Sequence, residues 1–222
     1  MKLCATKMPT EQPSKNYPTA AEFKQLLLTQ PLEEIVKARI FAGVPYAFSK
    51  RPQAMDTLRN HLSNQLRIPP ENVIVIGSAK IGFSLSPDNF PRAYSRRSDI
   101  DVLLVHPAMF DSVWKTLLAW HYPRRSSLDG VDWDWARHRR DEIYWGWLEP
   151  SRVRYDGLSF PDVLHPMRNL SAAWFGAFRS LARYPDFMGR DVSGRLYRTW
   201  DHALAYQVAA LKKIKALIQD WE

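Results

Sequence analysis

The residues of this chain best suited to chemistry lie between positions 73 and 105. Asp99 and Asp101 stand one residue apart and lead into the apolar run Val102–Val105. Residues i and i+2 of a β-strand point to the same face, so we expect both carboxylates to project together beside a buried strand. Two carboxylates this close repel each other unless a positive charge lies between them. A divalent cation such as Mg²⁺, which binds carboxylate and phosphate oxygens, meets this requirement.

A Gly-Ser turn precedes the two carboxylates. The β-branched run Val73–Ile76 is typical of a buried strand and ends at Gly77-Ser78. Glycine lets backbone N–H groups approach a phosphate closely, and serine adds a hydroxyl donor. Lys80 could supply a positive charge to the same phosphate. Taken alone, a Gly-Ser turn is more often an ordinary strand-to-turn connection, but an Asp-x-Asp strand that follows it favours a phosphate site.

This order of strand, Gly-Ser turn, spacer and Asp-x-Asp strand resembles the nucleotidyltransferase superfamily. That superfamily includes DNA polymerase beta, the minimal nucleotidyltransferases and the cGAS-like synthases. The resemblance covers residues 73–105 and implies that Asp99 and Asp101 are catalytic residues that ligate Mg²⁺ or Mn²⁺. It also implies that a nucleoside triphosphate, the substrate, is bound by Gly77, Ser78, Lys80, Gly82, Ser84 and Ser98.

Two features depart from the family pattern. The spacer Ala79–Ser98 is longer than in many minimal members, and its Arg92, Arg96 and Arg97 could reach RNA or a substrate phosphate. The third carboxylate that full members carry on a later strand is not identified. The alternatives are Asp191, Glu142, Glu149 and Asp156, whereas the strand-like segment Gly194–Arg198 carries arginine where an acid is expected.

Composition limits the classes of protein that this chain can belong to. With 222 residues and a formal net charge of +8, it suits one domain with polyanionic partners such as RNA, although a merely basic surface is the plain alternative. The single cysteine, Cys4, excludes an internal disulfide framework and a cysteine zinc site. The first residues lack the apolar core of a signal peptide, and no run approaches the 18–20 apolar residues of a membrane span. We therefore expect a cytoplasmic protein without a membrane partner.

The fold expected is α/β of the α+β type, with a small mixed sheet flanked by N-terminal helices and a C-terminal helical portion. Residues 1–18 are expected to form a flexible arm, residues 19–198 the nucleotidyltransferase-like domain, and residues 199–222 a helix packed on it. Apolar spacing predicts the remaining elements. These are helices over Pro52–Leu66, Pro107–Trp120 and Asn169–Arg183, strands over Val73–Ile76, Ile100–Val105 and Arg195–Tyr197, and a loop over Ser86–Ser98.

Three functions remain open at this point. The first is Mg²⁺-dependent transfer of NMP from an NTP to an acceptor, with RNA or a tRNA end favoured by the basic charge. The family resemblance implies a toxin–antitoxin or antiphage setting, with an antitoxin or another protein as a partner. The second is a catalytically silent member that binds nucleotide or nucleic acid within a larger defence assembly. The third is a plain RNA-binding module, which the charge and the aromatic residues favour and Asp-x-Asp does not.

Overall fold

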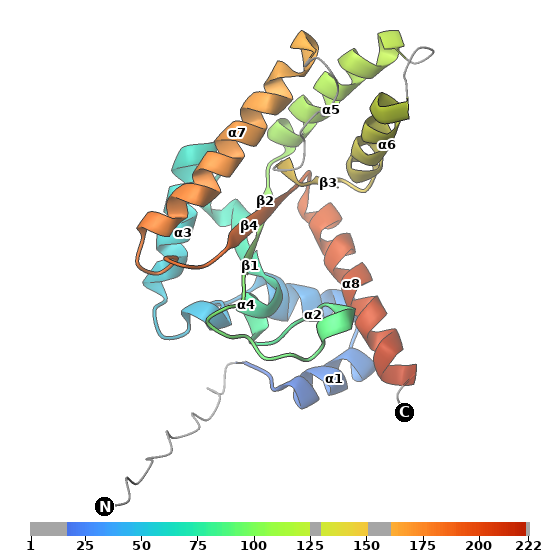
Figure 1. The fold of residues 1–222 in the computed structure, drawn as a ribbon. Helices are drawn as coiled ribbons and strands as arrows, with labels where there is room; N and C mark the ends of the chain where they lie inside the picture. The colour runs from blue at the N-terminus through green and yellow to red at the C-terminus, as the bar shows by residue number, and fades with distance from the viewer. Residues whose placement is uncertain (1–16, 125–129, 151–160, 221–222) are drawn as a thin grey trace, which may run out of the picture.

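The computed structural model describes residues 17–124, 130–150 and 161–220. In these residues a four-stranded mixed sheet has the order β1-β2-β4-β3 (Figure 1). Its strands are β1 (Val73–Ile76), β2 (Ile100–Val105), β3 (Trp147–Leu148) and β4 (Val192–Tyr197). Strand β2 pairs antiparallel with β1 and parallel with β4, and β3 pairs antiparallel with β4. The expected mixed α and β fold is confirmed.

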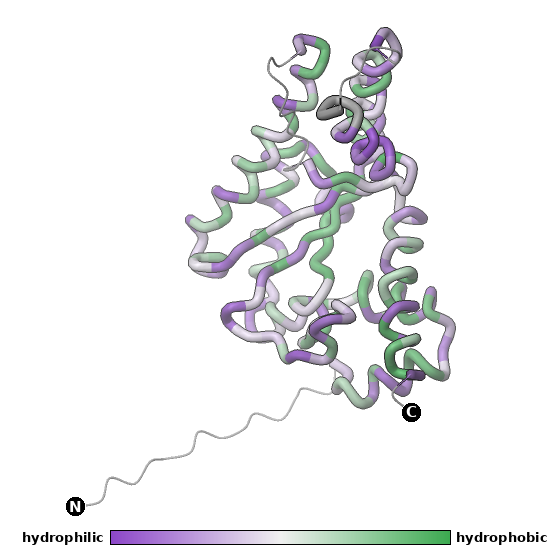
Figure 2. The backbone as a smooth tube through the Cα atoms, turned by 45° about the vertical axis from the view of Figure 1, so that its right-hand side comes forward, coloured by the Kyte–Doolittle hydropathy of each residue, from purple (hydrophilic) through white to green (hydrophobic). Residues whose placement is uncertain are grey.

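The two central strands form where the sequence is continuously apolar. Strands β1 and β2 have the predicted bounds, and the backbone in the middle of the molecule is largely hydrophobic (green) in Figure 2. A strand that is apolar on successive residues needs cover on both faces. Strand β4 begins at Val192, three residues before the predicted start, because its pairing with β2 supplies hydrogen bonds that local composition does not reveal.

One face of the sheet packs against three helices. Val75, Val102 and Leu196 belong to the large core cluster on this side. The helices are α3 (Gln53–Leu66), α5 (Pro107–His121) and α7 (His165–Arg179). Strand β4 comes very close to α7, since a Cβ on Gly194 would lie 2.3 Å from Cζ of Phe178.

The opposite face is covered by α8 (Trp200–Asp220), whose Ala203 packs with Leu103 and Tyr197. Further along, α8 packs against α1 (Ala20–Thr29), α2 (Leu32–Ile35) and the π-helical segment Val36–Phe41. Figure 1 shows α1, α2 and the C-terminal end of α8 gathered below the sheet, while α5, α6 and α7 extend above it. Helix α8 therefore joins the sheet to the N-terminal helices.

Some elements differ from the sequence expectation. Helix α6 (Gly130–Tyr144) was not predicted, because its apolar residues do not form a clear stripe. It is held by packing instead: Trp135 lies edge-on to Trp120 of α5, with ring centroids 5.1 Å apart. Helix α7 begins four residues earlier than predicted, and residues 1–16 of the expected arm lie outside the described chain.

The remaining short elements are turns. They are α4 (Gly77–Ile81) and the 3₁₀ segments Tyr46–Phe48, Pro70–Asn72, Pro87–Asn89, Tyr122–Arg124, Asp162–Leu164 and Ser180–Arg183. The predicted loop Ser86–Ser98 contains a single 3₁₀ turn and otherwise has no helix or long strand. Within the described ranges, none of the helices combines the length and the apolar character that crossing a membrane requires.

Candidate functional site

The Gly-Ser turn lies directly against one of the two carboxylates. Strand β1 ends at Ile76, which is paired with Asp101, and Gly77 turns the chain into α4 with φ of 65°. This positive φ favours glycine. A Cβ on Gly77 would lie 3.1 Å from Oδ2 of Asp101. The absence of a side chain at position 77 therefore lets the turn and the carboxylate lie close together.

Asp99 and Asp101 line the same cavity, although only Asp101 belongs to β2. Asp101 lies in the middle of the sheet, between Ile76 of β1 and Ser193 of β4. The hydroxyl of Ser193 donates to Oδ1 of Asp101 over 3.2 Å. Asp99 precedes the strand by one residue and is exposed to solvent. Asp101 faces the side of the sheet that α8 covers, because it alternates with Leu103, which packs with Ala203.

The charge of Asp101 is only partly compensated. Although solvent reaches this side chain through the cavity, burial among protein atoms raises its pKa above the ordinary value of 3.8. The hydrogen bond from Ser193 and the positive charge of Arg195 lower the pKa, while the negative charges of Asp99 and Glu149 raise it, and the net shift is upward. Positive charge brought to this carboxylate would therefore be stabilising.

A cavity of about 750 Å³ joins the turn to the carboxylates. This volume falls in the range of about 300–1,000 Å³ that small-molecule sites occupy. Of the predicted site residues, those that line it are Gly77, Ser78, Ser84, Arg92, Arg97, Ser98, Asp99 and Asp101. The hydroxyls of Ser84 and Ser98 accept from the backbone N–H groups of Ser86 and Ser95, so both also brace the loop.

Lys80 is not at the cavity, which corrects its predicted role. The side chain is only 4% exposed, and its Nζ donates to the backbone carbonyls of Ala42 and Gly43 over 2.5 and 2.6 Å. Burial, with a smaller effect of the positive charge of Arg59, lowers the pKa of Lys80 to about 8. The helical turn of α4 points this residue away from Asp101 and toward the segment that follows the π-helix.

Gly82 and Arg96 also lie outside this cavity. Gly82 ends α4 with φ of 97°, and a Cβ there would lie 3.0 Å from the ring of Tyr46. Its role is therefore to let a tyrosine pack against the turn. Arg96 lines a separate cavity on the other side of the loop. The sequence pattern placed Gly82 after the turn and Arg96 in the spacer loop, but it could not show on which side either residue lies.

Strand β4 and helix α8 bring residues to the cavity that the sequence did not identify. Arg195 of β4 lies between two rings, with its guanidinium carbon 4.5 Å from the centroid of Trp147 and 4.7 Å from that of Tyr206. Gln207 of α8 is a buried polar side chain at the cavity wall, and Ala210 lies one turn further along. Stacking on both sides holds the positive charge of Arg195 near Asp101.

One sequence signal could have found Gln207. Ala203, Leu211, Ile214 and Ile218 form the buried stripe of α8, and Gln207 is the polar residue in that stripe. A polar residue on the buried face of a helix needs a partner or a cavity. No comparable signal marks Ser193 or Arg195, because their positions depend on the pairing of β4 with β2.

The structure places three of the four alternatives for a third carboxylate. The β4 residue paired with Asp101 is Ser193, not an acid. Of the four alternatives, Glu149 lines the cavity, Asp191 and Glu142 do not, and Asp156 lies outside the described residues. In the described part of the chain, no three acidic, histidine or cysteine side chains form a group that could hold a metal ion.

The donor set nevertheless suits a hard cation. Asp99 and Asp101 supply carboxylate oxygens. Burial raises the pKa of Asp101, with smaller effects of the charges of Asp99 and Glu149, and a bound cation would stabilise the ionised form. Mg²⁺ commonly uses only one or two protein carboxylates and completes its shell with phosphate oxygens and water. These two residues could therefore hold Mg²⁺ or Mn²⁺ together with a bound phosphate.

Comparisons with protein-family models, with curated proteins and with solved structures each gave no match to this chain. Its candidate site is therefore interpreted from its own geometry and from the motif in its sequence.

Proposed function

We propose that this protein is a Mg²⁺-dependent nucleotidyltransferase that moves NMP from an NTP to an acceptor. The observation that carries the proposal is the meeting of the Gly77-Ser78 turn with Asp99 and Asp101 in one cavity of suitable size. A glycine turn beside paired carboxylates provides close backbone approach and anionic oxygen ligands at the same point.

Each group that lines the cavity would have its own role in the transfer. Ser78 would donate its hydroxyl to the triphosphate, and Arg92 and Arg97 would offset its negative charge from the loop. Asp99 and Asp101 would hold the cation, which supplies charge neutralisation for the transferred phosphate when bound. Arg195, fixed between its two rings, would balance the carboxylates and limit their movement.

RNA, including a tRNA end, is the acceptor that the charge favours. The chain has 31 lysine and arginine residues against 23 aspartate and glutamate residues. A surplus of positive charge attracts polyanions and speeds their association. The family resemblance adds a toxin–antitoxin or antiphage role, with an antitoxin or another protein as a partner.

A second function is favoured by one observation, which is Ser193 in the strand position paired with Asp101. A chain with a serine there could bind a nucleotide and its cation without transferring it. In that case the protein would act as a nucleotide-binding component of a larger assembly, and the cavity would serve recognition alone.

The test is label transfer from each α-labelled NTP in the presence of Mg²⁺ or Mn²⁺ and total RNA. We expect labelled RNA or a new nucleotide product with the unaltered chain. In the double variant Asp99→Asn, Asp101→Asn we expect a loss of at least about 100-fold, since even removal of groups that only support metal ligands costs 10–100-fold.

Equilibrium binding of the same NTPs separates the two functions. Nucleotide binding that needs Mg²⁺ and both aspartates, without any transfer, would favour the silent nucleotide-binding protein. Transfer that persists in the double variant would contradict the assignment of Asp99 and Asp101. Both substitutions keep the size of the side chain and lie at a solvent-reached site, so the variant is expected to fold.

A further inference from the structure

A second cavity, of about 610 Å³, lies behind the loop that forms one wall of the first. Around residues 93–97 the loop alternates between the two cavities: Ala93, Ser95 and Arg97 line the first, and Tyr94 and Arg96 line the second. The chain is extended at Ala93, which forms a bridge to Phe83, and it turns over Ser95–Ser98, where the N–H of Ser98 donates to the carbonyl of Ser95. The loop is therefore a wall that the two cavities share.

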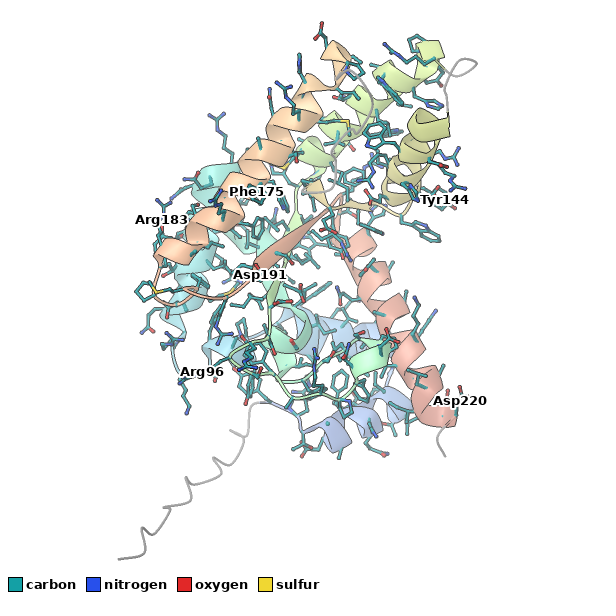
Figure 3. All side chains as sticks on the ribbon, in the orientation of Figure 1. Arg96, Tyr144, Phe175, Arg183, Asp191 and Asp220 are labelled. Atoms are coloured by element: carbon teal, nitrogen blue, oxygen red, sulfur yellow. The ribbon has the colours of Figure 1, made fainter. Side chains whose placement is uncertain are left out.

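Positive charge dominates the second cavity. Its lining includes Lys50, Arg51, Arg96 and Arg190 but a single carboxylate, Asp186, whose Oδ1 lies 2.5 Å from a guanidinium nitrogen of Arg51. In Figure 3, Arg96 lies at the lower left of the molecule, on the side opposite the end of α8 marked by Asp220. Among the described residues, the lining therefore carries four cationic side chains and one carboxylate, a net positive charge that suits a ligand with several negative charges.

Two tyrosines on the same wall offer aromatic surface. The rings of Tyr46 and Tyr94 meet edge to face with centroids 6.0 Å apart, and Arg190 donates to the hydroxyl of Tyr94. The Tyr46 ring packs against Gly82, which fixes its position. Fixed rings interleaved with arginines are the arrangement on which the bases of single-stranded nucleic acid stack.

We propose that this second cavity binds the nucleotides of a single-stranded RNA acceptor that lie next to its reacting end. Cations and rings alternate here in a concave site, as a chain of alternating phosphates and flat bases requires. The shared wall would let such a chain cross from the second cavity to Asp99 and Asp101 in the first. That the bound RNA is an acceptor rests on the proposed transferase activity, whereas RNA binding at this site does not depend on that activity.

The test measures the affinity of a short fluorescent single-stranded RNA over a range of salt concentrations. The variant is Lys50→Ala, Arg96→Ala, and both side chains are exposed. Its matched control is Lys212→Ala, Lys213→Ala on the exposed side of α8, which removes the same charge far from the cavity lining. We expect the cavity variant to bind about tenfold more weakly and to lower the salt slope by about 1.4, since each lost phosphate contact removes ≈0.7.

Three outcomes would overturn the inference. They are no RNA binding by the unaltered chain, an equal loss in the α8 control, and tighter binding to anionic phospholipid vesicles than to RNA. Label transfer from NTP is measured in parallel. Transfer with RNA binding that ignores Lys50 and Arg96 would leave the proposed function and remove this site. RNA binding that depends on both residues without transfer would keep the site and remove the enzyme.

Discussion

At the residue scale, Asp101 is constrained from three sides. The turn at Gly77 approaches it within contact distance, Ser193 donates to it, and Arg195 brings positive charge from β4. These groups do not offset the cost of burying its charge beside Asp99, so its pKa stays above the ordinary value. A carboxylate held in this way is a common feature of functional sites, where stability is exchanged for reactivity or binding.

The variant Asp101→Asn tests this description through stability. An acid whose pKa is raised by folding binds its proton more tightly in the folded state, so its contribution to the free energy of unfolding falls as pH rises through that pKa. At pH 7 we expect Asp101→Asn to unfold about 1–2 °C above the unaltered chain, because solvent screens part of the charge. The difference should shrink toward pH 3.8, the ordinary aspartate value.

Added Mg²⁺ provides the second measurement on the same variant. It should raise the unfolding midpoint of the unaltered chain and leave that of Asp101→Asn unchanged, since binding to the folded state alone is stabilising. If the variant unfolded at a lower temperature than the unaltered chain at neutral pH, the raised pKa of Asp101 would be contradicted. If Mg²⁺ stabilised both proteins equally, the proposed cation site would be contradicted.

At the element scale, the short helix α4 depends on a tertiary anchor. It spans only Gly77–Ile81, which is too short to be stable by itself. The ammonium group of Lys80 attaches it to the carbonyls of Ala42 and Gly43, immediately after the π-helical segment. The lysine that the sequence motif assigned to the triphosphate therefore supports the turn instead of reaching into the cavity.

The variant Lys80→Met separates these two roles. At pH 7 it should lower the free energy of unfolding by about 1–3 kcal/mol, because two carbonyls lose their donor. Between the folded pKa of about 8 and the ordinary value of 10.5, the folded chain binds fewer protons than the unfolded chain. The stability of the unaltered chain relative to Lys80→Met should then increase by on the order of 1–2 kcal/mol from about pH 7 to pH 9.5.

Urea unfolding at several pH values measures this effect, with the exposed Lys212→Met as the control that should show no such trend. A loss of label transfer larger than the loss of folded protein would instead support the original prediction that Lys80 binds the triphosphate. A pH-independent stability difference would contradict the lowered pKa.

At the scale of the whole molecule, the first cavity exists because distant segments meet. The turn after β1, the carboxylates of β2 and the wall of α8 are brought together when α8 crosses the sheet face (Figure 1). The second half of α8 is anchored in the core formed with α1 and α2. The N-terminal helices thus stabilise one wall of a site to which they contribute no lining residue within the described chain.

Filling the cavity from α8 tests this architecture. Ala210→Trp places a large ring at a cavity-lining position, whereas Ala209→Trp places it on the exposed side of the same helix. With Mg²⁺ and NTP at about 100 times Kd, the unaltered chain and Ala209→Trp should gain roughly 2.7 kcal/mol in the free energy of unfolding. We expect Ala210→Trp to lose most of this gain while its ligand-free midpoint stays similar. Equal gains in both variants would place nucleotide binding elsewhere.

Local patterns in the sequence determined the centre of the site. The strands Val73–Ile76 and Ile100–Val105, the turn after the first and the side of the sheet that Asp101 faces follow from strand periodicity and glycine conformation. These properties act over a few residues, so one sequence is sufficient to predict them. The same is true of the exposed arginine loop.

Tertiary structure alone decided what surrounds this centre. Ser193 and Arg195 reach Asp101 through the register of a parallel strand pair, and Gln207 through the crossing of α8, and neither relation is encoded locally. The side on which Lys80 and Arg96 lie was likewise set by packing, because the motif gives their spacing but not their direction. The sequence therefore determined the chemical groups at the centre of the site. Long-range packing decided which charged residues surround them, which segments line the first cavity and that a second cavity lies beside it.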